Sequence, residues 1–207
     1  MNTYYDPLTN RTLLKRPPAI VLDEVFKPHE FNDLKTRLEV MQEENVIPYE
    51  HGLGRYGLNA TSDIESPLSE YHQLALERAR SIFTPTLQPT YCLWVNYHGF
   101  RARLPRHVDD NACTYTIDLC ISYKTQWPIY IENEEFLLEP NQAACYYGED
   151  QYHWRGNFPD PAHNQVQMIF FHFAEPDHWY FTKGQSHVQN VIRVRHEYQK
   201  KNRIQSI

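Results

Sequence analysis

The chain has 207 residues, which suits one domain with a full hydrophobic core and is too short for two comfortable ones. The hydrophobic fraction is 41%, the mean hydropathy is −0.67 and no apolar stretch reaches ten residues, which excludes a membrane span and a secretory signal segment. Six Lys or Arg against one Glu give residues 183–207 a charge of +5, which leaves −11 on residues 1–182 within the total of −6 and disfavours nucleic acid as a partner.

The four cysteines lie inside apolar, strand-like stretches and form no C-x-x-C pair: Cys92, Cys113, Cys120 and Cys145. This pattern is typical of buried free thiols rather than of zinc ligands or disulfides. Together with the lack of a signal segment, it predicts a soluble protein of the reducing cytoplasm.

The first part of the chain predicts a strand and then helices. The run AIVLDEVF at 19–26 is rich in β-forming residues, Pro28 is favourable at a helix start, and apolar positions between 31 and 41 recur every three or four residues. A second helix is predicted at 67–82, where SPLSE supplies a cap and an early acid. Between the helices, VIPYEHGLGRYGLN at 46–59 is expected to be a loop or short strand.

From about residue 90 the pattern changes to short β-branched or aromatic runs separated by Pro, Asn, Asp and Gly, among them YCLWVNY, TYTIDLCISY and VQMIFFHFA. Helices followed by six or more closely spaced strands predict an α+β, mainly β domain whose β part is a sandwich or barrel. We divide this single domain of residues 1–207 into a helical support at 1–89, a β core at 90–175 and a C-terminal extension at 176–207.

The residues with the clearest chemistry are a His-Val-Asp tripeptide, with His107 and Asp109, and a later histidine, His153. In an extended chain residues i and i+2 face the same side, so the first two side chains can converge on one metal ion. His153 comes 44 residues after Asp109, beyond three more strand-like runs, which is the right order of separation for an antiparallel sheet to return over the pair. Two histidines and one carboxylate leave open positions on a non-haem Fe(II), whereas a closed zinc site needs a fourth ligand.

This order of residues resembles the Fe(II)- and 2-oxoglutarate-dependent dioxygenases, most closely their small prolyl-4-hydroxylase-like members. The resemblance covers roughly residues 90–175, with Y-x-G at 97–99, HVD at 107–109, HWR at 153–155 and then an aromatic strand. It implies a double-stranded β-helix, a jelly-roll or cupin-like barrel that the N-terminal helices buttress. By the same resemblance Tyr97 helps to bind 2-oxoglutarate, and the iron ligands are His107, Asp109 and His153.

One departure from the family concerns the cation that holds the C5 carboxylate of 2-oxoglutarate. The family usually places an Arg or Lys on the strand after the distal histidine, and residues 156–182 contain neither. Arg155 lies two residues after His153, should point into the same barrel interior, and can bind a carboxylate through two parallel hydrogen bonds. Lys124, at the end of the ISYK strand, is the second choice, because some relatives hold the carboxylate from that strand.

The resemblance implies an oxygenase, most simply a hydroxylase of an unactivated C–H bond, that uses O₂ and releases succinate and CO₂, with ascorbate as a candidate reductant. Asp109 favours hydroxylation over halogenation, because related halogenases carry a small residue at this position. A peptide side chain, an amino acid and a small molecule all stay open as substrates, to be selected by loops at 43–66, 98–106 and 174–190. The charge of −11 on residues 1–182 favours a neutral or cationic substrate.

Two alternatives remain. A cupin-type metalloenzyme would use the same three ligands without 2-oxoglutarate, which would explain the missing cation. A catalytically silent barrel would act as a ligand-binding or scaffold protein through its aromatic residues and basic tail. The remaining histidines, including His172 in its aromatic strand, are expected to pack in the core or lie at the surface.

Overall fold

The computed structural model describes residues 3–7, 10–44, 47, 49–61, 67–110 and 112–184. No helix in these ranges is both long and apolar enough to cross a membrane. Residues 185–207 of the basic tail, and parts of the expected loops 43–66 and 174–190, lie outside the described residues. The elements are, in chain order, β1 (Thr3–Asp6), β2 (Arg11–Leu14), β3 (Ile20–Leu22), α1 (Pro28–Glu44), β4 (Tyr49–Glu50), β5 (Arg55–Thr61), α2 (Pro67–Ile82), β6 (Gln88–His98), β7 (Leu104–His107), β8 (Tyr115–Tyr123), β9 (Ile129–Ile131), β10 (Glu134–Phe136), β11 (Ala143–Tyr146), β12 (His153–Arg155), β13 (Gln165–Ala174) and the π-helix η1 (Tyr180–Gly184).

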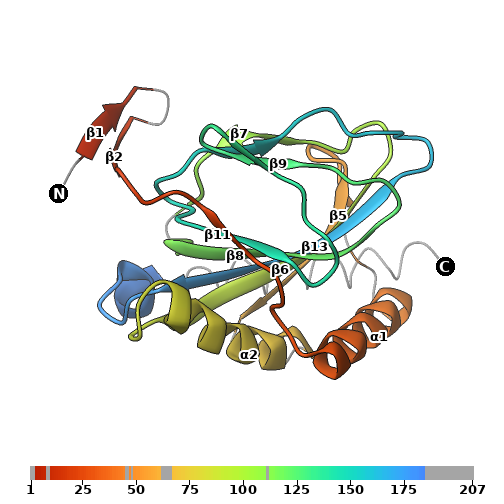
Figure 1. The fold of residues 1–207 in the computed structure, drawn as a ribbon, viewed down its shortest axis with the longest axis horizontal. Helices are drawn as coiled ribbons and strands as arrows, with labels where there is room; N and C mark the ends of the chain where they lie inside the picture. Colours follow the sequence, from red (N-terminus) through yellow and green to blue (C-terminus); the bar gives the residue numbers. More distant parts are fainter. Residues whose placement is uncertain are drawn as a thin grey trace.

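Two antiparallel sheets lie face to face, with both helices on the outer side of the larger one (Figure 1). The larger sheet has the order β3-β11-β8-β13-β6-β5-β4 and the smaller one β10-β9-β12-β7. Among the described residues, no strand pairing joins the two sheets into a continuous barrel. The arrangement confirms the predicted mainly β jelly roll supported by N-terminal helices.

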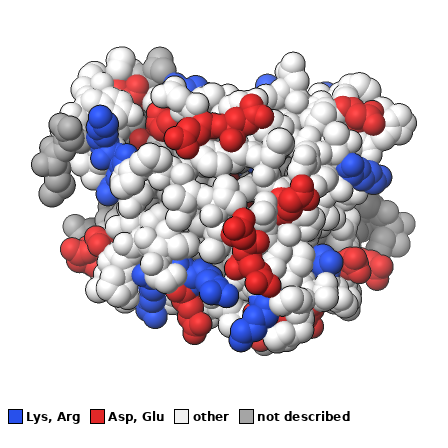
Figure 2. Space-filling model, viewed as in Figure 1, with Lys and Arg blue, Asp and Glu red and all other residues white. Residues whose placement is uncertain are grey.

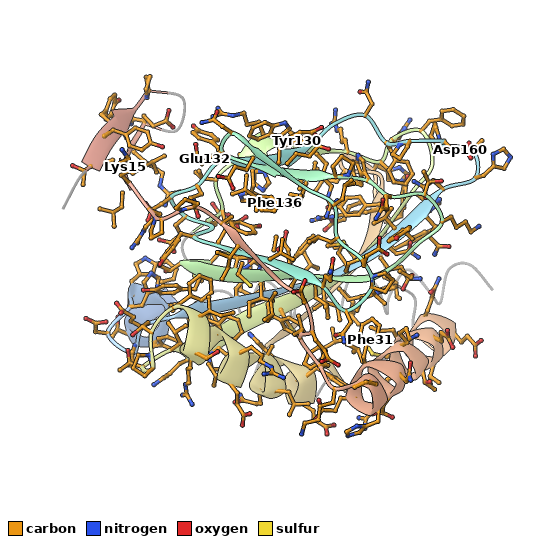
Figure 3. All side chains as sticks on the ribbon, in the orientation of Figure 1. Lys15, Phe31, Tyr130, Glu132, Phe136 and Asp160 are labelled. Carbon is orange, nitrogen blue, oxygen red and sulfur yellow. The ribbon has the colours of Figure 1, made fainter. Side chains whose placement is uncertain are left out.

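Both helices begin where the sequence predicts, at Pro28 and Pro67, because proline lacks the N–H that the first helical turn leaves unbonded. The apolar side of each helix packs on the larger sheet: Leu34 of α1 and Ala79 of α2 are fully buried. Phe31, labelled in Figure 3, belongs to the same core. Burial of these faces, rather than intrinsic helix propensity, is the main source of helix stability.

The strand expected at 19–26 is shorter in the structure, where only Ile20–Leu22 pairs with β11. Val25 and Phe26 leave the sheet because their backbone N–H groups donate to the carbonyl and side-chain oxygens of Asn141, at 3.1 Å each. The segment 46–59, expected as a loop or short strand, contains β4 and the start of β5, which extends the larger sheet beside β6.

The central strands of the larger sheet, β6, β8 and β13, are buried on both faces along most of their length. Trp94 of β6 packs in the core under the helices, and its neighbour Val95 packs in the second core between the sheets. Phe136 of β10 lies against that inner core (Figure 3). Double burial explains the nearly continuous apolar runs of the sequence. The four cysteines are buried and free, as predicted.

His72 of α2 lies between the helix and the sheet and is almost fully buried. Its Nε2 donates to the carbonyl oxygen of His172 on β13 at 3.0 Å, and its ring packs on Phe171 and Phe173. Burial lowers the pKa of His72 to about 3, so the folded protein keeps this imidazole neutral.

We therefore predict that acid destabilises the protein in part through His72. The unfolded chain takes up a proton at this residue below about pH 6.5, and the folded chain does not, which costs up to about 1.4 kcal/mol per pH unit. Between pH 7 and pH 5 the wild-type free energy of unfolding should fall by about 2 kcal/mol more than that of His72→Gln, which can still donate to the same carbonyl. Urea unfolding at both pH values measures this difference, and equal losses in the two proteins would contradict it.

Candidate metal centre

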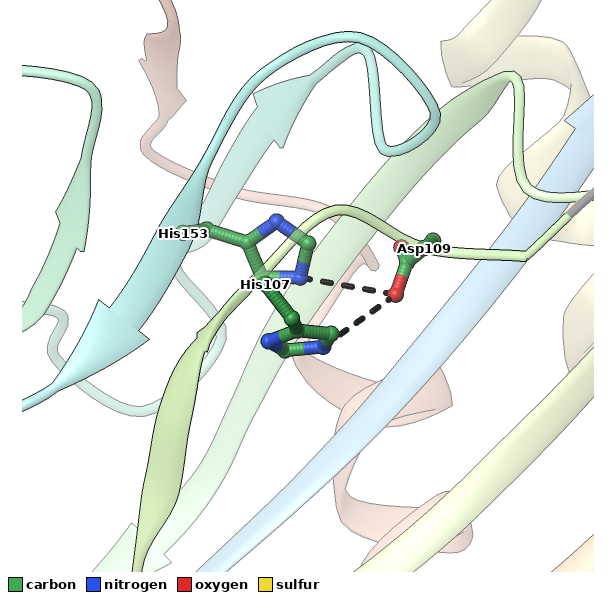
Figure 4. Close-up of side chains that lie close together, drawn as sticks. All are labelled: His107, Asp109 and His153. Carbon is green, nitrogen blue, oxygen red and sulfur yellow. Dashed lines mark ion pairs between the residues drawn. The ribbon is translucent and has the colours of Figure 1, made fainter. Parts of the chain in front are cut away.

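Three side chains that can hold a metal ion converge where β7 ends and β12 begins: His107, Asp109 and His153 (Figure 4). The two histidines are direct partners across the antiparallel β7–β12 pair. Asp109 Oδ1 lies 3.5 Å from His107 Nε2 and 3.4 Å from His153 Nε2. One carboxylate oxygen and two imidazole nitrogens therefore face a common point.

Both imidazole rings are held by the backbone. Nδ1 of His107 donates to the carbonyl oxygen of Pro105 at 2.8 Å, and Nδ1 of His153 donates to that of Gln151 at 3.0 Å. A neutral ring with its proton on Nδ1 has a lone pair on Nε2 that can bind a metal ion, whereas a ring protonated on both nitrogens donates from Nε2 to Asp109. Such outer hydrogen bonds fix the tautomer and ring orientation of histidine metal ligands.

The electrostatics of the cluster favour a charged carboxylate. Burial opposes ionisation of Asp109, but the charge of His153 and hydrogen bonds from both histidines hold its pKa well below its usual range. Burial likewise opposes protonation of His153, but Asp109 raises its pKa above the ordinary value. The cluster therefore attracts positive charge, which a divalent cation can supply in place of a proton.

The backbone on both sides of Asp109 is fixed. Its N–H donates to the carbonyl of Gly148 at 2.8 Å, and Arg11 Nη1 donates to its carbonyl at 3.0 Å. Its second carboxylate oxygen, Oδ2, is buried without a hydrogen-bond partner among the described residues. Gly148 permits this close approach, because a Cβ at that position would lie 2.4 Å from Asp109 Oδ2.

The β1–β2 hairpin, which projects from the sheets in Figure 1, also holds the segment before His153. The Tyr152 hydroxyl donates to the Asp6 carboxylate, and Asp150 accepts from Arg16 Nε at 2.6 Å. Sequence analysis did not find this hairpin or its contacts, because they join residues more than 130 positions apart and leave no local pattern.

A cavity of about 310 Å³ adjoins the three side chains. Sequence analysis missed three polar residues in its wall, which are Arg55, Tyr91 and Asp118. His172, expected as a packing residue, is buried and also lines the cavity. Asp118 left a readable signal, since it is a lone acid inside the apolar run TYTIDLCISY. Its Oδ2 accepts from the Tyr146 hydroxyl at 3.1 Å, and burial raises its pKa to about 7.

Of the three residues predicted to contact 2-oxoglutarate, two are buried and one is exposed. Tyr97 is buried, and its hydroxyl accepts a hydrogen bond from Arg55 Nη1 at 2.8 Å. Arg155 is also buried, and its Nη2 lies 3.6 Å from Met168 Sδ on β13. Lys124 is exposed and lines a separate surface pocket that includes none of the three cluster residues.

Comparisons with known proteins give matches in structure only. No family model matches the sequence, and no curated protein matches it. A prolyl-4-hydroxylase from Pseudomonas putida is 13% identical with a TM-score of 0.56, and the match covers 76% of this chain and 92% of that one. HygX from Streptomyces hygroscopicus, solved with nickel and 2-oxoglutarate bound, is 8% identical with a TM-score of 0.60, covering 77% and 83% of the two chains.

A third similar structure is the non-haem α-ketoglutarate-dependent epimerase SnoN from nogalamycin biosynthesis. It is 7% identical with a TM-score of 0.59, and the match covers 76% of this chain and 78% of that one. The chain therefore has the fold of the Fe(II)- and 2-oxoglutarate-dependent oxygenases.

The approach of Gly148 to Asp109 gives a test of the cluster. We predict that Gly148→Ala lowers the affinity for a divalent cation such as Co(II) at least about tenfold, because the added methyl group displaces the carboxylate. Gly156→Ala is the matched control, since its Cβ would meet only Tyr130, at 3.9 Å. Titration of the metal-free proteins with Co(II), followed by visible absorption, measures both affinities. Equal affinities would show that Asp109 does not contribute to binding.

Proposed function

We propose that the protein is an Fe(II)- and 2-oxoglutarate-dependent oxygenase that hydroxylates an unactivated C–H bond. The observation that supports this most directly is the convergence of His107 Nε2, His153 Nε2 and Asp109 Oδ1, with both Nδ1 atoms bonded to backbone carbonyls. Two imidazoles and one carboxylate on one side of a metal suit Fe(II) and leave positions open for further ligands.

The chain's own residues fit a bound iron. Asp109 and the two histidines would hold it, and the buried Oδ2 of Asp109, which has no hydrogen-bond partner among the described residues, supports this role. When bound with 2-oxoglutarate and O₂, the iron would supply the oxidising power that a C–H bond requires, which protein side chains lack. Arg11 and Gly148 would keep Asp109 in place through its backbone.

Arg155 is the residue that fits the far carboxylate of 2-oxoglutarate. β13 carries no Arg or Lys, yet the guanidinium of Arg155 reaches that strand at Met168 from the facing sheet. Arg155 forms no ion pair with a described acid, and its Nε is buried without a partner. Burial lowers its pKa, although Tyr97 and Asp118 oppose this effect, and a bound carboxylate would stabilise the charge further.

Tyr97 fits the same role. Its hydroxyl oxygen already accepts a hydrogen bond from Arg55, which leaves its own proton free for a carboxylate oxygen. Its ring packs edge-on against Trp127, whose carbonyl oxygen accepts from Arg155, so the two candidate donors belong to one group of side chains.

One observation supports a second candidate, the cupin-type metalloenzyme that needs no 2-oxoglutarate. Arg155 does not line the cavity beside the three ligands, and among the described residues Arg55 is the Arg or Lys that does. In this alternative the three ligands would bind a metal ion and the substrate directly, and Arg155 would have a structural role.

The first test is direct. Under anaerobic conditions the protein with Fe(II) and 2-oxoglutarate should show the weak visible absorption of the metal–co-substrate chelate, and admission of O₂ should yield succinate. His153→Ala should lose both signals, because only two of the three ligands remain. Fe(II) binding, measured by calorimetry, without any affinity for 2-oxoglutarate would support the cupin-type alternative instead.

The second test separates the two predicted cations. Arg155→Met should weaken 2-oxoglutarate binding at least about tenfold and leave Fe(II) binding unchanged, because it removes a charge-assisted hydrogen bond and no metal ligand. Lys124→Met should change neither affinity, since the lysine side chain is exposed and lines a separate surface pocket rather than the interior between the sheets. Isothermal titration calorimetry under anaerobic conditions measures the affinity of each variant for Fe(II) and for 2-oxoglutarate. Loss of binding in the lysine variant alone would assign the carboxylate to Lys124.

A further inference from the structure

A second hollow, of about 850 Å³, lies beside the metal cavity on the surface. The turn between β6 and β7 forms one wall, and residues 156–158 after β12 form another. The loop that contains Asp160, labelled in Figure 3, borders it through Pro161. We call this hollow the arginine groove, because its cationic residues are Arg101, Arg103 and Arg155.

The charge of the arginine groove is opposite to that of the whole chain. None of the described residues that line it is Asp or Glu, although the chain carries a net charge of −6. On the face shown in Figure 2, by contrast, acidic side chains form several groups across the middle and upper part. Asp160, the acid on the bordering loop, is already paired with His163 at 3.0 Å.

The two exposed arginines both line the groove. Ala102 and Leu104, which alternate with them along the chain, are buried. Arg103 Nε donates to the carbonyl of Gly52 at 2.7 Å, which leaves its two terminal nitrogens for a ligand. Arg101 has no hydrogen-bond or ion-pair partner in the described part of the chain.

The backbone that carries these arginines is fixed. A Cβ on Gly54 would lie 2.1 Å from the backbone carbon of Arg101, so the β4–β5 turn packs directly on the backbone of this segment. The Ala102 N–H donates to the carbonyl of Gly99 at 3.1 Å, and the Arg103 N–H donates to that of Leu53 at 3.1 Å. A ligand would therefore meet donors that are already positioned, which reduces the entropy lost on binding.

The groove and the metal cavity share part of a wall. Leu104 and Pro105 line both hollows, and His107 ends the same strand. At about 3.3 Å per residue, Arg103 lies about 13 Å along the strand from His107. A molecule held by the arginines at one end can thus extend toward the metal cluster with its other end.

We propose that the arginine groove binds the anionic end of the substrate, a small molecule that carries a phosphate or carboxylate group about 10 Å from the carbon that reacts. The identity of the ligand as the substrate rests on the proposed function. The binding of an anion in the groove does not depend on it.

The test uses metal-free full-length protein and two probes, inorganic pyrophosphate and citrate, at physiological ionic strength. Saturable shifts are expected in the ¹H–¹⁵N spectrum for the backbone amides around residues 101–104 and 156–157. Arg101→Gln/Arg103→Gln should weaken binding of the preferred probe at least tenfold. Whether pyrophosphate or citrate binds more tightly distinguishes a phosphate from a carboxylate ligand, and either supports the proposal.

Arg106→Gln is the matched control, because Arg106 is exposed on the same segment but lies over the Tyr152 ring, outside the groove. The affinity of this variant for the preferred probe should lie within twofold of the wild-type affinity. Equal weakening in the control and the double variant, or no saturable shift in wild type, would overturn the proposal. So would a loss of 2-oxoglutarate affinity in the double variant, since the arginines would then serve the co-substrate. Probe binding in a protein that makes no succinate would reject the proposed function and leave the anion site standing.

Discussion

The antiparallel pairing of β7 with β12 is the constraint on which the candidate site depends. It sets His107 opposite His153, and the Cα atoms of such partners are held about 5 Å apart by the sheet itself. The rings then need only their backbone carbonyl partners to face Asp109. The larger sheet keeps this pair in place, because its inner face fills the space between the sheets with a packed core. A metal site built in this way costs little ordering entropy when the ion binds.

Much of this arrangement could be predicted from the sequence because its signals are local. The i, i+2 spacing of His107 and Asp109 predicts a shared face, and the helix starts at Pro28 and Pro67 follow from residue preferences. Which cation reaches the interior between the sheets is harder to predict, because this depends on register between distant strands. Lys124 directly follows β8, whose earlier residues enter the core, yet its own side chain is exposed.

Two of the residues that sequence analysis missed, Arg11 and Arg55, reach the site through contacts across long separations. Arg11 reaches the Asp109 carbonyl over 98 positions, and no local pattern marks either residue as a partner. Arg55 lies in a stretch with three glycines, expected as a loop or short strand, but it begins β5 and bonds to Tyr97. For Arg155 the missing signal lies on another strand. β13 contains no Arg or Lys, but the guanidinium of Arg155, from β12 of the facing sheet, reaches β13 at Met168. A missing residue on one strand is therefore weak evidence against a ligand site in a jelly roll.

The net charge of the chain and the local charge of the arginine groove have opposite signs. A total of −6, and −11 on residues 1–182, favours neutral or cationic substrates when the charge is treated as uniform. Salt screens exposed charges beyond about 8 Å at physiological ionic strength, so a ligand in the arginine groove responds mainly to the side chains that line it. Those side chains include three arginines and, among the described residues, no acid. Local charge thus favours an anionic ligand beside the metal cavity, even though the protein as a whole is acidic.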